Sequence, residues 1–146
     1  TDRRFQFKGK YRDADIIDDY AHHPTEIRAT LTTAAGYPHK KTLCIFQPHT
    51  YTRTNAFMDD FASALSIADE VVLAEIYAAR ETNVLGISSA DLAKKINALG
   101  TKCSFYQTFS EIEAYVASEI NDGDIVITMG AGNVYEIGED LLKEDR

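Results

Sequence analysis

The sequence predicts an α/β fold: a mostly parallel, Rossmann-like sheet with helices on both faces and a small N-terminal hairpin or edge strand. Short apolar runs alternate with segments of helical periodicity along the chain, and two runs, at 42–46 and 125–127, are continuously apolar. Parallel neighbours in a sheet are joined by right-handed crossovers, which helices usually provide. Strands buried on both faces show continuous apolar runs. Helices are therefore expected on both sides of the sheet.

The first part of the chain predicts two strands and a helix. Aromatic residues alternate with polar ones over residues 5–11, the pattern of the hairpin or edge strand. A second apolar run follows at 14–17. Pro24 suits the first position of a helix, because its missing N–H would be unpaired there anyway. This helix is expected to end near residue 36.

The rest of the chain repeats the alternation. Short apolar runs predict strands, and apolar residues spaced by three or four predict amphipathic helices. Gly100 follows one such segment and is expected to end its helix. The predicted strands cover 42–46, 71–74, 104–106 and 125–127, and the predicted helices cover about 55–68, 92–99, 112–120 and 134–142.

Composition limits the class of protein. The length of 146 residues and the 45% share of hydrophobic residues suit a single domain, predicted to span residues 1–146. The net charge of -8 argues against nucleic acid and membrane surfaces as partners. No apolar stretch approaches the roughly 18 to 20 residues of a membrane span, and no signal peptide begins the chain. We expect a cytoplasmic protein.

The two cysteines do not predict a metal site. Cys44 and Cys103 lie in apolar, strand-like runs without a partner cysteine or histidine at the spacing of metal ligands. Buried reduced thiols are the expected state of both residues.

Polar residues gather where predicted strands give way to helices. The first such junction, residues 18–26, contains three acidic residues, a tyrosine and two histidines. Ligands of open α/β sheets bind outside the carboxyl ends of the strands. A single histidine in a loop is usually a solvated surface residue, but this crowding favours a site that includes Asp19, Tyr20, His22 and His23.

Two further junctions add to this picture. At residues 47–54, Arg53 could bind a carboxylate or phosphate through two donors, or else pair with an acid on a neighbouring helix. Gly130 and Gly132 flank Ala131 before the last helix, where backbone N–H groups could approach a polar ligand. This is not a complete G-x-G-x-x-G motif, because its third glycine would fall at Tyr135. The chain also lacks a G-x-x-x-x-G-K-[ST] loop, so another part of the protein would have to hold nucleotide phosphates.

The stretches DDYAHHPTEI, FQPHTYTRT and MGAGN, in this order and spacing, resemble the C-terminal domain of the Mur ligases. The resemblance covers nearly the whole chain, and its D-x-A-H-x-P core is also similar to that of folylpolyglutamate synthetases. It implies an ATP-dependent ligase of three domains: one for the UDP-sugar, a central one with the ATP phosphate loop, and this one, which closes over both. The chain would then be a fragment of a larger enzyme, inactive alone.

The resemblance also implies roles for individual residues. The carboxylate of the sugar would be phosphorylated by ATP to an acyl phosphate, which the amine of the amino acid attacks. Asp19 would bind the ATP ribose and Arg4 would reach the γ-phosphate, while the central domain holds most of the ATP and Mg²⁺. The implied catalytic residues are Arg4, Asp19 and His22, and the implied amino-acid pocket contains Tyr20, His22, Arg53 and the backbone of Ala131.

Alternatives remain open. Some family members carry a second arginine where this chain has Thr50, so recognition of the substrate carboxylate could depend on Arg53 alone. Tyr20 and Glu26 favour the members that add L-alanine to UDP-N-acetylmuramate over the relative that recycles a tripeptide onto the same sugar. A free-standing module that binds a nucleotide or an amino acid is the other hypothesis. A dinucleotide-dependent oxidoreductase is disfavoured, because the glycines follow the last strand.

Overall fold

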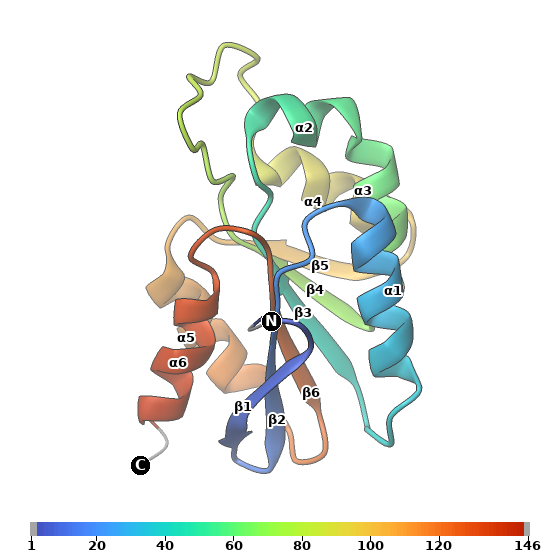
Figure 1. Cartoon of the computed structure of the whole chain (residues 1–146), viewed down its shortest axis with the longest axis vertical. Coiled ribbons are helices and arrows are strands. Elements are labelled where there is room, and N and C mark those ends of the chain that lie inside the picture. The colour runs from blue at the N-terminus through green and yellow to red at the C-terminus, as the bar shows by residue number, and fades with distance from the viewer. Residues whose placement is uncertain (1–2, 145–146) are drawn as a thin grey trace.

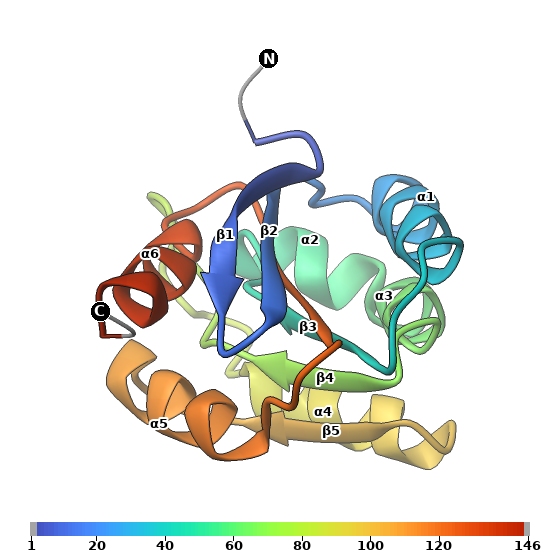
Figure 2. The same ribbon diagram turned by 90° about the horizontal axis from the view of Figure 1, so that it is seen from below.

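The computed structural model describes residues 3–144, which form one six-stranded sheet with helices on both sides (Figures 1 and 2). The strand order is β1-β2-β6-β3-β4-β5, and β1 is antiparallel to β2 whereas the other pairs are parallel. The predicted fold class is confirmed, with β1 as the edge strand of an N-terminal hairpin. The elements are β1 (Gln6–Tyr11), β2 (Ala14–Asp19), α1 (Pro24–Ala35), β3 (Thr42–Phe46), α2 (Tyr51–Ala56), α3 (Met58–Leu65), β4 (Glu70–Leu73), α4 (Ser89–Ala98), β5 (Lys102–Phe105), α5 (Phe109–Glu119), β6 (Ile125–Met129) and α6 (Tyr135–Glu144).

The insertion of β6 between β2 and β3 determines where a ligand could bind. The chain runs outward from β2 through β3 and β4 to β5, and α5 then carries it back to β6. Met129 at the end of β6 pairs with both Asp19 of β2 and Phe46 of β3. The carboxyl ends of these three strands therefore lie side by side, at the kind of reversal in strand order where open α/β sheets bind ligands.

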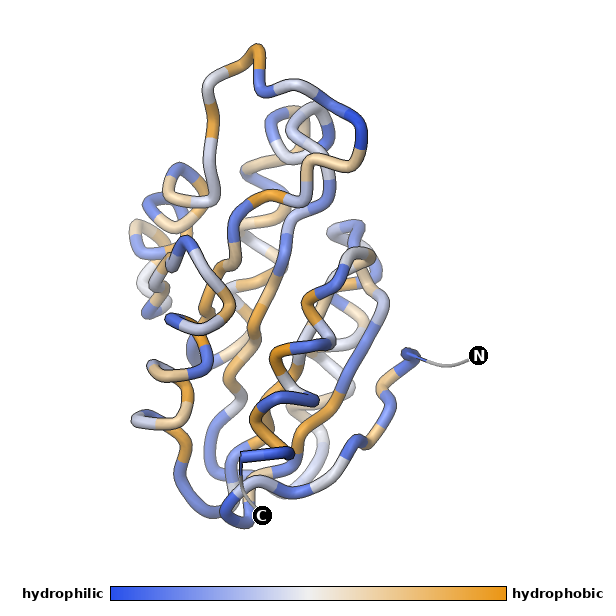
Figure 3. The backbone as a smooth tube through the Cα atoms, turned by 90° about the vertical axis from the view of Figure 1, so that its left-hand side faces the viewer, coloured by the Kyte–Doolittle hydropathy of each residue, from blue (hydrophilic) through white to orange (hydrophobic). Residues whose placement is uncertain are grey.

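The core consists of two layers separated by the sheet. Successive side chains of a strand point to opposite faces, so Cys44 and Phe46 pack toward α1, α3 and α4, whereas Leu43 and Ile45 pack toward α5 and α6 (Figure 2). Figure 3 shows hydrophobic segments through the middle of the molecule and mostly hydrophilic turns at its lower end. Cys44 and Cys103 are both free thiols, but only Cys44 is fully buried, because β5 lies at the edge of the sheet.

Two expected elements differ in detail. The helix expected over 55–68 is two helices, α2 and α3, separated at Phe57, whose φ of −121° and ψ of 26° interrupt the helical conformation. The hairpin turns at Arg12 and Asp13, which have φ values of 50° and 63°, whereas Gly9 lies in a bulge of β1. Within residues 3–144, no helix is both long and apolar enough to cross a membrane.

Candidate functional site

The three polar junctions of the sequence meet at the carboxyl edge of the sheet (Figure 1). The N–H of Gly130 donates to the carbonyl of Asp19 (3.2 Å), and the N–H of Gln47 donates to the carbonyl of Met129 (3.1 Å). The Nε2 of Gln47 also donates to Oδ1 of Asn133 (3.1 Å). The segments after β2, β3 and β6 therefore form one connected surface.

Arg3 links the N-terminal segment to two of these junctions. Its Nε donates to Oδ2 of Asp18 (2.6 Å), and its Nη1 and Nη2 donate to the carbonyls of Gly132 (3.2 Å) and Gly130 (2.8 Å). The Asp18 side chain is only 2% exposed and also accepts a hydrogen bond from Thr128 (2.8 Å). Arg3 thus neutralises a buried carboxylate and holds the glycine-containing loop against β2. No pattern in the sequence predicted this role of Arg3.

Asp19 forms the wall of a pocket of about 330 Å³ that also contains Arg4 and Tyr20. Both carboxylate oxygens of Asp19 accept backbone N–H groups, from Phe5 and Ala21, each at 2.8 Å. Arg4 is exposed, and its side chain has no hydrogen bond or ion pair within residues 3–144. Asp19 therefore orders the N-terminal segment, which places Arg4 beside the same pocket.

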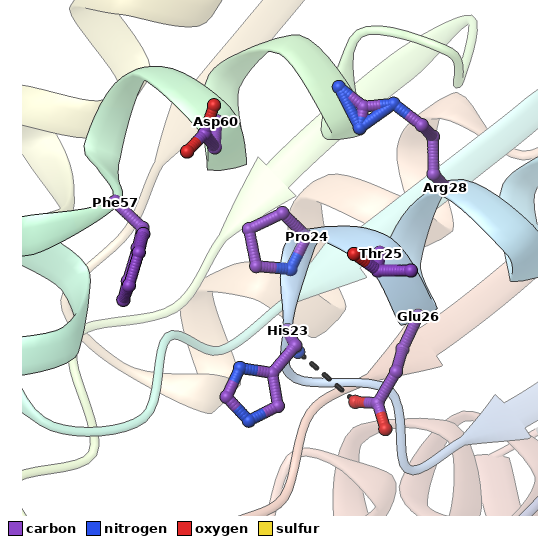
Figure 4. A pocket seen from close by; sticks show the side chains of 7 residues that line it. All are labelled: His23, Pro24, Thr25, Glu26, Arg28, Phe57 and Asp60. Carbon is purple, nitrogen blue, oxygen red and sulfur yellow. Dashed lines mark hydrogen bonds between the residues drawn. The ribbon is translucent and has the colours of Figure 1, made fainter.

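Figure 4 shows a neighbouring pocket of about 610 Å³ between the start of α1 and the junction of α2 and α3. It is lined by His23 and Glu26 on one side and by Phe57 on the other. Oε1 of Glu26 accepts the backbone N–H groups of His22 (3.1 Å) and His23 (3.2 Å). Burial acts to raise the pKa of Glu26, but these hydrogen bonds outweigh it and hold the pKa below its usual value. The ionised Glu26 thus fixes the backbone that carries both histidines.

His22 connects the first junction to the second. Its ring contacts those of Tyr20 (5.3 Å between centroids) and His49 (6.3 Å), and His49 stacks on Tyr77 at 5.5 Å. Burial lowers the pKa of His49, and the positive charge of Arg53 lowers it further. His49 is therefore neutral at neutral pH, and its buried Nδ1 has no hydrogen-bond partner within the described residues.

Arg53 lies in the first turn of α2 with a side chain that makes no hydrogen bond or ion pair within residues 3–144. The alternative that it pairs with an acid of a neighbouring helix is thus not what the structure shows. The turn begins at Thr50, whose φ of 69° and ψ of 145° are unusual for a β-branched residue. Oγ1 of Thr50 accepts the N–H of Arg53 at 3.3 Å. Thr50, the position at which a second arginine was considered, therefore serves as the N-cap of α2.

The loop before α6 needs its glycines for packing. A Cβ on Gly132 would lie 2.5 Å from Oε1 of Gln47 and 3.0 Å from the ring of Tyr77, and a Cβ on Gly130 would lie 2.8 Å from the carbonyl of Gln47. Ala131 lies between these glycines, and within residues 3–144 no hydrogen bond joins it to the other expected pocket residues. That the loop admits a ligand remains a prediction.

The structure brings most of the expected site residues together. Arg4, Asp19 and Tyr20 line one pocket. The ring of His22 contacts the rings of Tyr20 and His49, and the positive charge of Arg53 acts on His49. The sequence did not predict the contacts of two residues. These are Arg3 and Glu81, and Glu81 lies in a loop that reaches the start of α2. Among residues 3–144, no three histidine, cysteine or acidic side chains are arranged to hold a metal ion.

Comparison with known proteins gives consistent matches. The profile of the family described as "Mur ligase, glutamate ligase domain" matches residues 3–132. The chain is 58% identical over 143 residues to the UDP-N-acetylmuramate–L-alanine ligase of Lachnospira eligens and 59% identical over 144 residues to that of Agathobacter rectalis. These alignments cover 98% and 99% of this chain but 31% of each relative, so the chain spans less than a third of their length.

Comparison with solved structures gives matches to related ligases. The UDP-N-acetylmuramate-alanine ligase of Thermotoga maritima matches with a TM-score of 0.78 and 28% identity, over 97% of this chain and 29% of that one. A murein peptide ligase of Psychrobacter arcticus has a TM-score of 0.76 over the same shares of the two chains. Its identity is 21%, so it shows a shared fold alone.

Proposed function

This chain belongs to the Mur ligase family, and from that premise we propose that it acts in an ATP-dependent ligase that joins L-alanine to UDP-N-acetylmuramate. It would supply the amino-acid pocket and part of the ATP site, while other domains of the same protein supply the rest. The observation that carries this proposal is the guanidinium of Arg53, which has no hydrogen-bond or ion-pair partner within residues 3–144 and lies near His49, whose ring contacts that of His22, at the edge where the three junctions meet. A guanidinium without a partner suits the carboxylate of an incoming amino acid.

Asp19 and Arg4 carry groups that suit the ribose and the phosphates of ATP. An ionised carboxylate has about four acceptor positions, and Asp19 uses two of them for backbone N–H groups. The remaining two would accept hydrogen bonds from the ribose hydroxyls of ATP. Arg4, exposed beside the same pocket, could reach a phosphate. The residues present therefore fit the nucleotide contacts that the family resemblance implied.

The reaction places separate demands on this domain. When bound, ATP with Mg²⁺ supplies the phosphoryl group that activates the carboxylate of the UDP-sugar. Arg4 would stabilise negative charge on that group, and Arg53 would hold the amino acid by its carboxylate so that the amine faces the activated carbonyl. Tyr20 and His22 would form the wall of the pocket, and the backbone of Ala131 would close it. Such catalysis depends on positioning and charge stabilisation more than on a nucleophilic side chain.

Ligation of a tripeptide to the same UDP-sugar is the second candidate. The shared fold with the murein peptide ligase is compatible with it. The two relatives described above, at 58% and 59% identity, however, both carry the name of L-alanine ligases. That similarity favours L-alanine as the acceptor.

The test is substrate-dependent release of ADP by the complete protein. We expect ADP only when UDP-N-acetylmuramate and L-alanine are both present, and turnover lower by about a hundredfold or more in Asp19→Ala and Arg53→Ala. His39→Gln is the control, because His39 lies in the turn between α1 and β3, away from the carboxyl edge. Activity with a tripeptide and none with L-alanine would establish the second candidate.

The isolated chain provides a second test. It should show no ligase turnover, because the phosphate loop is not in its sequence. Calorimetry should show only weak binding of ATP or L-alanine, since a closing domain binds tightly only against its neighbours. Tight binding by the isolated chain would support a free-standing binding module instead.

A further inference from the structure

The loop of residues 77–88 leaves β4 and projects beyond the carboxyl edge of the sheet before it returns to α4 (Figure 1). Its base extends the pairing of β3 with β4: the N–H of Tyr77 donates to the carbonyl of Pro48 (2.8 Å), and the N–H of Thr50 donates to the carbonyl of Tyr77 (2.8 Å). Farther out, Nδ2 of Asn83 donates to the carbonyl of Ile87 (2.8 Å). The loop is therefore held at its base and closed across its outer part.

Glu81 ties the middle of this loop to α2. Its Oε1 accepts the N–H of Tyr51 at 2.6 Å and the N–H of Thr52 at 3.1 Å. The first N–H groups of a helix have no partner within the helix. Thr50 already caps the N–H of Arg53 at 3.3 Å. The first turn of α2 is thus capped from two sides, by Thr50 before it and by Glu81 about thirty residues later.

The charge of Glu81 interacts with two residues of the second junction, Arg53 and His49. The hydroxyl and N–H of Thr52 hold the pKa of Glu81 below its usual value, and Arg53 contributes to the same effect. Glu81 also acts on His49, where its negative charge opposes the lowering of the histidine pKa by burial and by Arg53. At neutral pH the Glu81 carboxylate is therefore ionised and bound to the turn that carries Arg53.

The conformation of α2 is supported by contacts from outside the helix. α2 has six residues, and a helix that short has little stability of its own in water. Its start at Thr50 has a positive φ of 69°, a conformation that persists only when the surroundings impose it. The Arg53 side chain itself makes no hydrogen bond within residues 3–144 that could orient it.

We propose that Glu81 is a positioning residue for the substrate carboxylate: by capping the first turn of α2 it aims the guanidinium of Arg53 into the amino-acid pocket. The proposal rests on the proposed function for the identity of the substrate. The cap itself does not, so it is tested separately.

The first experiment measures amide hydrogen exchange in the isolated chain by NMR. Glu81→Ala should speed exchange at Tyr51 and Thr52 by about tenfold or more, because both N–H groups lose their acceptor. Glu81→Gln should stay within about threefold of the parent chain, because its amide oxygen can still accept. Glu136→Ala, in the first turn of α6, is the matched control and should leave both rates unchanged. Equal rates in Glu81→Ala and the parent chain would overturn the proposal.

The second experiment measures steady-state kinetics of the complete ligase. Glu81→Ala should raise KM for L-alanine on the order of tenfold while KM for ATP and for the UDP-sugar stays within about twofold. Glu81→Gln should restore most of the loss. Because Glu81 is argued to act through Arg53, Glu81→Ala combined with Arg53→Ala should match Arg53→Ala alone. Multiplied losses in the double variant would contradict the proposal.

The two experiments separate the possible failures. If the parent enzyme releases no ADP with L-alanine, the proposed function fails, while the exchange result still decides whether Glu81 caps α2. If the parent enzyme is active and Glu81→Ala raises KM for all three substrates alike, the residue has a general structural role and the proposal is wrong.

Discussion

Arg3→Ala should destabilise the domain although Arg3 lies near the beginning of the chain. The substitution leaves the Asp18 carboxylate, whose side chain is 2% exposed, with the Thr128 hydroxyl as its remaining side-chain partner. Removal of one partner of a buried ion pair costs about 3 to 5 kcal/mol, because the other charge stays buried and uncompensated. The hydroxyl of Thr128 offsets part of that loss. The lower end, about 3 kcal/mol, is therefore expected.

This loss corresponds to a measurable shift of the melting temperature. The entropy of unfolding is about 2.1 cal/mol/K per residue, and over 146 residues it amounts to about 0.3 kcal/mol/K. A loss of about 3 kcal/mol then lowers Tm by about 10 °C. Thermal unfolding followed by circular dichroism or calorimetry on the isolated chain measures it directly.

The adjacent residue is a matched control. Arg4 has the same side chain but is exposed and makes no hydrogen bond or ion pair within the described residues, so Arg4→Ala should change stability by no more than about 0.5 kcal/mol. In the proposed assay of the complete protein, Arg4→Ala should lower turnover more than Arg3→Ala does, and its small effect on stability should not explain that loss. A Tm for Arg3→Ala within about 2 °C of the parent chain would refute the reasoning about the buried pair.

Two further predictions concern pH and packing. Burial and the neighbouring Asp140 raise the pKa of Glu113 from 4.5 to about 7, so the folded chain holds a proton that the unfolded chain releases, and stability falls as pH rises through this window. Glu113→Gln should therefore raise Tm at about pH 8 and lose this gain near pH 4.5; an equal gain at both would contradict the assignment. Gly130→Ala should cost about 1 to 3 kcal/mol in denaturant unfolding, because its Cβ would lie 2.8 Å from the backbone carbonyl oxygen of Gln47 and its φ of 147° strains a residue with a side chain. Gly36→Ala, whose nearest contact would be 3.4 Å, is the control; equal stability of both variants would show that the loop can yield.

The sequence was sufficient to predict the architecture because its signals are local. Continuous apolar runs identified the buried strands β3 and β6, and Pro24 marked the beginning of α1. The break at Phe57 was missed, because apolar residues keep their helical spacing across it. The Gly9 region was part of the expected hairpin, but the turn itself forms at Arg12 and Asp13.

The candidate site was predicted less completely than the fold. Placement of polar residues after β2, β3 and β6 followed from the alternation of elements, and the structure joins these junctions through backbone hydrogen bonds. The sequence could not tell which of two adjacent arginines would turn inward. Arg3 does so, since it meets a buried carboxylate and two loop carbonyls, while Arg4 remains exposed.

By itself, the sequence determined the fold class, the family and the edge of the sheet where polar residues gather, since each depends on patterns of a few neighbouring residues. Only the tertiary structure decided the partners of Arg3 and Glu81. Arg3 contacts the carbonyl of Gly132, 129 positions away, and Glu81 caps Tyr51, 30 positions away. Contacts over such separations arise from the order of strands in the sheet. No local pattern encodes them, because the contact of Arg3 requires β6 beside β2 and the contact of Glu81 requires β4 beside β3.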